Sequence, residues 1–225
     1  MKLLTRELLA LKNSDVAEKE LVDIVSSHAT TEQIVEYLAE QTLKPIIDAQ
    51  GYSHQLGFHK FIISDLDGTH PRKIRLHLWE KGKIEDDIHD HIAPFASKIL
   101  HGYLTHEIYQ RGRSGEHFFW HRFSACSDGC VPSEECTVST ELELACRTTI
   151  AERETYFLNY DALHRAVPVS QRVISLVVQD TPVDRQINVF RCKPRSTQSD
   201  LARRLSNDET RAYFQKILSV LGNEE

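Results

Sequence analysis

The segment Lys73-Ile74-Arg75-Leu76-His77-Leu78-Trp79 alternates between polar or aromatic residues and aliphatic ones. This period of two is typical of a β-strand, because successive side chains point to opposite faces of a sheet. Similar short segments, rich in β-branched and aromatic residues and separated by turn residues, surround it. The predicted strands are 58–63, 74–79, 88–91, 98–109, 116–124, 137–145, 155–158, 165–169, 173–179 and 188–192. Many short strands at near-regular spacing predict a sandwich or barrel.

Helical patterns flank this β-rich region. Apolar residues at helical spacing predict helices over 3–11, 21–25, 31–47 and 199–221. We expect Pro45 to kink or divide the third helix and Gly51 to close it. The mainly β chain is therefore divided into an N-terminal helical extension (1–52), which packs on the barrel or on a second subunit, a β-barrel domain (53–195) and a C-terminal helix (196–225).

Composition excludes several classes of protein. The 225 residues carry a net charge of −6, and a nucleic-acid-binding domain would normally carry a basic face. No segment approaches the roughly 20 apolar residues that span a bilayer, and the first residues lack the apolar core of a secretory signal. The five cysteines are an odd number, which favours a reducing compartment over a disulfide framework. We expect a cytoplasmic monomer or homodimer that binds neither nucleic acid nor membrane.

Twelve histidines are the unusual feature of the composition. His89 and His91 are two residues apart in a predicted strand, so both imidazoles point to the same face and can reach one metal ion. His164, at the start of a later strand, is the best candidate for a third ligand. The spacing alone fits a hydrated surface pair about as well as a pair of ligands.

The wider sequence resembles the two motifs of the cupin superfamily. The residues that carry the first motif are His89, His91 and Gly102, with Gly82 one residue further out than the pattern and Phe95 where the family has a glutamate. The second motif is reduced to Asn159-x-Asp161-x-x-His164, which keeps the histidine. A cupin with three histidines and no glutamate resembles the thiol dioxygenases.

Between residues 74 and 190 the chain is similar, in patches, to cysteine dioxygenase. The similar segments are Leu78-Trp79, Ile88-His89-Asp90-His91, Lys98-Ile99-Leu100-x-Gly102-x-Leu104, Leu163-His164-Arg165 and Ile174-Ser175-Leu176. The resemblance implies a cupin-type (jelly-roll) barrel in which His89, His91 and His164 bind Fe(II) facially and leave three positions open for substrate and O2.

Three departures from that family bear on the substrate. Near Phe95 the animal enzymes have a cysteine crosslinked to a tyrosine, but this chain lacks that cysteine and has Gln179 in place of the tyrosine. Val177 replaces the family's histidine two residues earlier. Because these groups organise oxygen and thiolate in the family, cysteine is not the expected substrate.

Candidate pocket residues follow from the alternation of the strand 73–79. Arg75, His77 and Trp79 share one face, and the resemblance implies that this face lines the active site, where Arg75 would clamp a carboxylate. The alternative is an outward Arg75 whose stem packs on Trp79. Gln179 is a further candidate for a hydrogen bond to substrate or to a ligating histidine. Four histidines are weaker candidates, with surface or core roles favoured: His101, His106, His117 and His121.

Cys126, Cys130 and Cys136 offer a second hypothesis, a structural zinc site with His121 as fourth ligand. Their spacing lacks the C-x2-C pair typical of such sites, so an exposed hairpin with reduced thiols is favoured.

The function expected from the sequence is oxidation of a small carboxylate- or thiol-bearing molecule by O2 at one Fe(II) ion. Two alternatives remain open. One is an isomerase, lyase or hydrolase that uses Zn2+, Mn2+ or Ni2+ as a Lewis acid. The other is a cupin that binds a small ligand without catalysis.

Overall fold

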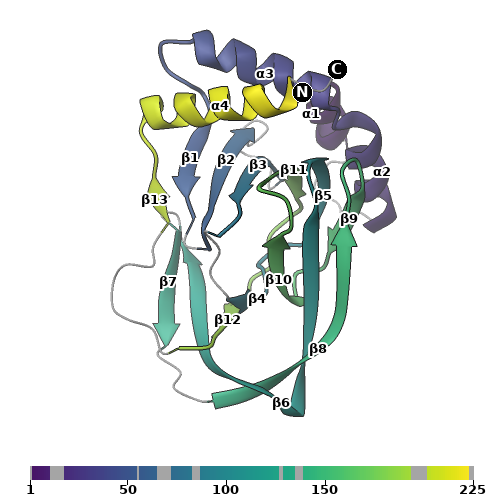
Figure 1. Ribbon diagram of the computed structural model, residues 1–225, viewed down its shortest axis with the longest axis vertical. Helices are drawn as coiled ribbons and strands as arrows, with labels where there is room; N and C mark the ends of the chain where they lie inside the picture. The colour runs from purple at the N-terminus through teal and green to yellow at the C-terminus, as the bar shows by residue number, and fades with distance from the viewer. Residues whose placement is uncertain are drawn as a thin grey trace.

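The computed structural model describes residues 2–10, 18–54, 56–64, 72–82, 87–126, 129–134, 139–193 and 202–222 (Figure 1). The helices in these ranges are α1 (Lys2–Ala10), α2 (Glu18–His28), α3 (Thr31–Leu43) and α4 (Asn207–Leu221). The strands are β1 (Gln50–Ser53), β2 (Phe58–Ser64), β3 (Lys73–Glu80), β4 (Ile88–His89), β5 (Phe95–His101), β6 (Leu104–Cys126), β7 (Gly129–Glu134), β8 (Ser139–Ile150), β9 (Thr155–Leu158), β10 (Leu163–Pro168), β11 (Arg172–Gln179), β12 (Ile187–Arg191) and β13 (Arg203–Arg204). The expected class, a mainly β barrel with N-terminal helices and a C-terminal helix, is confirmed.

Two antiparallel sheets form the barrel. The seven-stranded sheet has the order β13-β1-β2-β3-β11-β5-β9. In the six-stranded sheet β6 pairs with β10 over 104–109 and with β12 over 119–123. Because β4 pairs with both β10 and β12, these four strands form a closed ring of pairings. The two-residue strand β4 is thus held on both sides, which places the His89 backbone firmly between two neighbours.

The helices pack on the seven-stranded sheet and lie at the top of the view in Figure 1. Apolar residues of all four helices and of β3 share one buried cluster, to which β3 contributes Ile74, Leu76 and Leu78. Burying each such side chain stabilises the fold by roughly 1.5–3 kcal/mol. Since the aliphatic face of β3 is covered by helices, its other face, with Arg75 and Trp79, is directed into the barrel.

Local signals explain where two of the helices begin. Thr30 caps α3 by accepting a hydrogen bond from the Gln33 backbone N–H. Ser206 and Glu209 form a capping box at the start of α4, where each side chain satisfies the backbone N–H of the other. Among the residues described, no helix is long and apolar enough to cross a membrane.

Three predictions about the helical ends are wrong. The third helix ends at Leu43, before Pro45, because proline disfavours helical geometry in the preceding residue. Gly51 closes no helix but lies in β1, where α4 approaches so closely that a Cβ would lie 2.6 Å from Thr210 Oγ1. The C-terminal helix starts only at Asn207, after the short strand β13, which pairs with β1.

Several predicted strand boundaries are also wrong. The predicted strand 98–109 is two strands, β5 and β6, separated by Gly102 and Tyr103. The predicted strand 88–91 ends at His89. The predicted strands 98–109 and 116–124 are not separated by a break near residues 112–115: β6 continues through these residues as a bulge, in which Arg111 and Glu116 both lie opposite Leu142 of β8. The strands β1, β7 and β13 were not expected.

Candidate metal centre

Three histidines from separate parts of the barrel wall lie together. His89 and His164 are direct partners across the β4–β10 pairing, and His91 lies two residues after His89 in the connection to β5. Although β4 ends at His89, the chain stays extended enough that Asp90 donates its N–H to Asn188 O and His91 donates its own to Tyr160 O. The expected convergence of the three imidazoles is therefore present.

The distances fit a single ion. One ligand nitrogen from each ring can be chosen so that all lie within 4.8 Å of one another, and His91 Nε2 lies 2.8 Å from His164 Nε2. Two nitrogens that bind one ion at about 2.1 Å and at right angles lie about 3 Å apart. The 2.8 Å contact serves as a hydrogen bond between the rings, and the same spacing suits two ligands of one metal.

The surroundings keep these imidazoles neutral, which is the form that binds metal. Burial lowers the pKa of His89 from 6.5 to about 4. Burial is the largest cause that lowers the pKa values of His91 and His164 well below 6.5, and the closeness of other histidines, which disfavours a charge on either ring, adds to it. His164 Nδ1 is buried without a hydrogen-bond partner among the described residues. The donor set, neutral nitrogens alone, suits Fe(II), Zn2+, Mn2+, Ni2+ or Cu2+.

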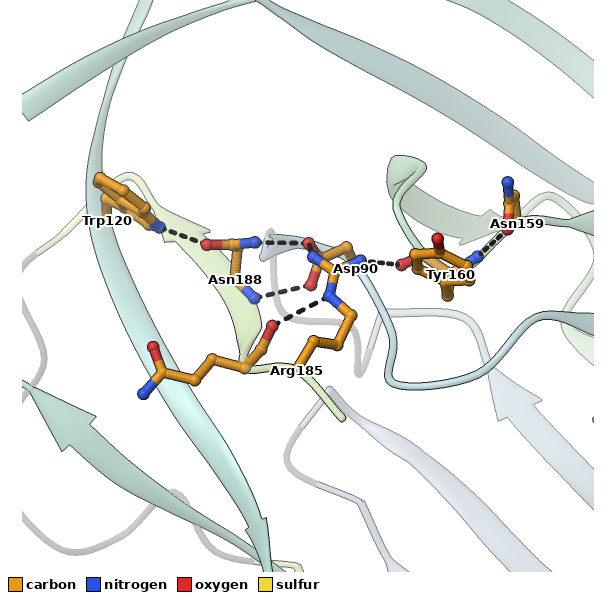
Figure 2. Close-up of polar contacts among 7 residues, drawn as sticks. Asp90, Trp120, Asn159, Tyr160, Arg185 and Asn188 are labelled. Carbon is orange, nitrogen blue, oxygen red and sulfur yellow. Dashed lines mark hydrogen bonds and ion pairs between the residues drawn. The ribbon is translucent and has the colours of Figure 1, made fainter. Parts of the chain in front are cut away.

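Asp90, which lies between His89 and His91 in the sequence, has its side chain in a polar clasp with Asn188 and Arg185 (Figure 2). Its side chain accepts hydrogen bonds from Asn188 N at 2.7 Å, from Asn188 Nδ2 at 2.5 Å and from Arg185 Nη2 at 2.5 Å. Asp90 is 2% exposed, and Trp120 Nε1 in turn donates to Asn188 Oδ1 at 2.9 Å. The clasp fixes the backbone between the two ligand positions to β12.

The same clasp reaches the segment that leads to the third histidine. Arg185 Nη1 donates to the Tyr160 carbonyl at 3.1 Å, and its guanidinium lies 5.3 Å from the centre of the Tyr160 ring. That carbonyl also accepts the hydrogen bond from His91 N at 2.9 Å. Tyr160 precedes β10, so one arginine and one carboxylate connect all three segments that carry the imidazoles (Figure 2).

The histidines open into a cavity of about 210 Å3 between the sheets. All four residues predicted to act on substrate lie in its wall: Arg75, His77, Trp79 and Gln179. The inward orientation implied by the resemblance is thus correct, and the alternative of an outward Arg75 is wrong, because helices cover the other face of β3. Their roles toward a substrate stay a prediction.

Of the other residues of the wall, His106 was a weaker candidate from the sequence, whereas His54, Lys60 and Tyr156 were not singled out. His106 is 5% exposed, with ring centres 5.1 Å from His164 and 4.4 Å from Tyr156. His54, Lys60 and Tyr156 also line the cavity. Phe58, Lys60 and Ile62 share one face of the predicted strand 58–63, because they are two residues apart. The sequence does not say that this face lines the cavity, which follows only from the pairing of β2 with β3. The surface or core role favoured for His106 is wrong in one respect, since its ring faces the cavity.

The remaining candidates lie elsewhere. His101 lies 3.6 Å from Glu152 and His117 lies 3.6 Å from Glu141, and neither histidine lines the cavity. Cys136 lies outside the described residues, as do the side chains of Cys126 and Cys130. The zinc hypothesis therefore stays a prediction. His121 is 7% exposed on β6.

No family model matches this chain, and no curated protein does. Among solved structures it is similar to oxalate decarboxylase from Lactobacillus farciminis (TM-score 0.36, 10% identity, 58% of this chain and 30% of that one). It is also similar to a cupin superfamily protein from Desulfitobacterium hafniense (0.31, 10%, 56% and 78%) and to hydroquinone 1,2-dioxygenase in a complex with Cd2+ (0.33, 9%, 53% and 62%). So distant a likeness concerns the barrel alone and transfers no function.

The buried histidines predict an acid-sensitive protein when metal is removed. Burial lowers the pKa of His106, like that of His89, to about 4, and those of His54 and His77 well below 6.5. The unfolded chain then binds more protons than the folded one, so stability is full above pH 6.5 and falls as pH drops toward 4. Each such histidine contributes a slope of about 1.4 kcal/mol per pH unit within that window. Urea unfolding of metal-free protein from pH 8 to 4 measures it, and a flat profile over this range would contradict the expectation.

Proposed function

We propose that this protein is a mononuclear non-heme iron enzyme that oxidises a small carboxylate-bearing molecule with O2. The observation that carries the proposal is the meeting of three neutral imidazoles, with no carboxylate in that group, at the wall of a cavity. His89, His91 and His164 would hold the ion on one side and leave its other positions to the cavity.

Fe(II) held by these three histidines would supply redox chemistry with O2, which the side chains of the protein cannot supply themselves. The protein positions the organic molecule. Arg75, on the opposite sheet, presents a planar guanidinium whose paired N–H groups match a carboxylate. Phe95 stands where the cupin motif has a glutamate, and its ring centre is 5.1 Å from that of His91. An apolar phenyl ring cannot bind metal, so this side of the metal site has no fourth protein ligand from residue 95.

The Lewis-acid enzyme and the non-catalytic binding protein remain the competing functions, and one experiment separates all three. Protein purified without affinity-tag metals is analysed for bound elements, loaded anaerobically with Fe(II), and mixed with O2 and a panel of small thiols and carboxylates. We expect about one iron per chain and substrate-dependent oxygen consumption. Tight zinc or nickel binding without oxygen uptake would favour the Lewis-acid enzyme. Failure to bind any of these metals would refute the proposal.

The control for this experiment is Phe95→Glu, which supplies the carboxylate that the family motif contains. We expect this variant to bind metal more tightly but to turn over more slowly, because the added ligand takes a position otherwise available to substrate or O2. A variant with unchanged metal affinity would show that residue 95 does not border the ion.

A further inference from the structure

Packed aromatic side chains form the part of the cavity wall that β2 and β3 contribute. Phe58 stacks on Trp79 with the ring centres 4.1 Å apart, and on His54 at 4.4 Å. The ring centre of His77 lies 4.8 Å from that of Phe58. All four residues line the cavity, and Phe58 and Trp79 are only 6% and 7% exposed. We call these four residues the Trp79 stack.

A second group of rings lines the cavity next to the three converging histidines. The ring centre of Tyr156 lies 4.4 Å from that of His106 and 6.2 Å from that of Phe95. Phe95 is in turn 5.1 Å from His91, and His106 is 5.1 Å from His164. A ligand bound beside the metal centre would therefore lie against Phe95, His106 and Tyr156, which we call the Tyr156 group.

Ionisable rings in both groups are uncharged near neutral pH. Burial is the largest cause that lowers the pKa values of His54 and His77 well below 6.5. Burial also raises the pKa of Tyr156 to about 12. Neutral imidazole and phenol rings bring no formal charge that a ligand would have to balance, so they add aromatic surface to the wall.

The rest of the wall and the size of the cavity also suit a ring. Apolar side chains from several strands complete the lining, among them Leu56, Phe123, Ala166, Val177, Ile187 and Val189. The cavity volume is about 210 Å3. An apolar cavity of about 150 Å3 is large enough to hold benzene. The space therefore accommodates one six-membered ring with small substituents.

One polar atom of the Trp79 stack is left for a ligand. Trp79 Nε1 is buried and has no hydrogen-bond partner among the described residues. Buried donors are nearly always satisfied, and an indole N–H can only donate. The partner of this N–H in the cavity is therefore an acceptor, such as an oxygen atom of the ligand.

We propose that the cavity binds a small aromatic carboxylate, whose single ring packs against the Trp79 stack and the Tyr156 group, in preference to an aliphatic acid. Contacts between aromatic rings add affinity beyond the burial of apolar area, so a wall built of rings favours an aromatic ligand. The carboxylate of the ligand rests on the proposed function, which assigns it to Arg75. The site for the ring does not depend on that function.

The test uses three carboxylates that differ in the body of the molecule: benzoate, cyclohexanecarboxylate and acetate. Calorimetry measures their binding to the full-length protein, first with metal removed and then with Zn2+ bound as a redox-inert ion. We expect benzoate to bind about 10-fold or more tightly than acetate, because its ring buries apolar area. It should also bind about 3-fold more tightly than cyclohexanecarboxylate, which has no aromatic ring. Equal affinities for benzoate and acetate, tighter binding of cyclohexanecarboxylate, or no benzoate binding in either state would overturn the proposal.

Val177→Phe tests whether the ring occupies this cavity. Val177 on β11 is 4% exposed and lines the cavity, so a phenyl group there fills the space proposed for the ring. We expect benzoate affinity to fall about 10-fold or more, and acetate affinity to change much less. Val183→Phe is the matched control, since Val183 is 39% exposed and does not line the cavity. It should change neither affinity, and unaltered benzoate affinity in Val177→Phe would overturn the proposal.

Phe58→Leu tests the aromatic wall without filling the cavity. Leucine keeps the site apolar but removes the central ring of the Trp79 stack. We expect the preference for benzoate over cyclohexanecarboxylate to disappear, while acetate binding persists. A folding defect would instead abolish binding of all three acids, and circular dichroism would detect it. An undiminished preference for benzoate in this variant would count against the proposal.

The two proposals fail separately. Selective benzoate binding by a protein that takes up no metal would leave the ring site standing and refute the iron enzyme. Stoichiometric iron with oxygen consumption, but with equal affinities for benzoate and acetate, would do the reverse.

Discussion

Replacing His164 with alanine is expected to reduce bound metal from about one ion per chain to less than a tenth of that. His164 has its Nε2 atom 2.8 Å from that of His91 and is the ligand contributed by β10. Two remaining imidazoles, His89 and His91, leave too few protein ligands for a stable site. The alanine side chain only enlarges an existing cavity, so the barrel should remain folded. Elemental analysis after gel filtration, together with circular dichroism, measures both effects.

Two further histidine variants make this result specific. His117→Ala removes an exposed imidazole and should change nothing. His106→Ala removes a ring of the cavity wall that is not one of the three converging ligands, and it should retain the metal. Near-stoichiometric metal in the His164→Ala protein, or equal losses in His106→Ala and His164→Ala, would show that the ion is held elsewhere or differently.

Replacing Asp90 with asparagine is expected to weaken metal binding by 10- to 100-fold, although Asp90 is not one of the three converging residues. Groups that orient ligating residues typically contribute this much to affinity. The amide cannot accept the bonds from Asn188 and Arg185 with the strength of a carboxylate, so the backbone between His89 and His91 loses its anchor. Competition titration with a fluorescent chelator gives the affinity, and urea unfolding gives a loss in stability of about 2 kcal/mol.

Glu107→Gln is the matched control for Asp90→Asn. Glu107 is a buried carboxylate, 4% exposed, that pairs with Arg165 at 2.6 Å and Arg147 at 2.7 Å. Its loss should destabilise the fold to a comparable degree with a smaller effect on metal affinity, since it binds Arg165 on β10 but does not link the three segments that carry the imidazoles to one another. A similar drop in metal affinity for both variants would mean that Asp90 acts only through global stability.

The local patterns in the sequence predicted most of the secondary structure. They failed where tertiary contacts determine whether a segment forms a strand and where that strand ends. The strands 58–63, 74–79, 155–158 and 173–179 agree with β2, β3, β9 and β11 to within one residue at each end. The stretch 111–115 falls between two predicted strands but is a bulge within one strand, because β8 pairs with β6 on both sides of it. Strands β1 and β13 are too short, at four and two residues, for an alternating pattern to be recognised in the sequence. Their pairing with each other is visible only in the tertiary structure.

The candidate site shows the same division. The pair His89 and His91 follows from the period of a strand, and the third histidine was proposed from the resemblance and its place after a turn. Lys60, His106 and Tyr156 could not be assigned to the cavity wall from the sequence. Each comes from a different strand, and only the pairing of the strands brings them to one cavity. The Asp90 clasp was likewise invisible, because its partner Arg185 is 95 residues away along the chain.

The sequence by itself determined the periods of the strands and helices, the class of fold and the residue types available to bind a metal, because these depend on side chains close together in the chain. The tertiary structure decided which face of β3 points into the barrel. Alternation shows that Arg75 and Leu76 point to opposite sides, but both sides of this sheet are covered. The helices bury the aliphatic face of β3 in the larger apolar cluster, and the polar face is thereby left to form the cavity.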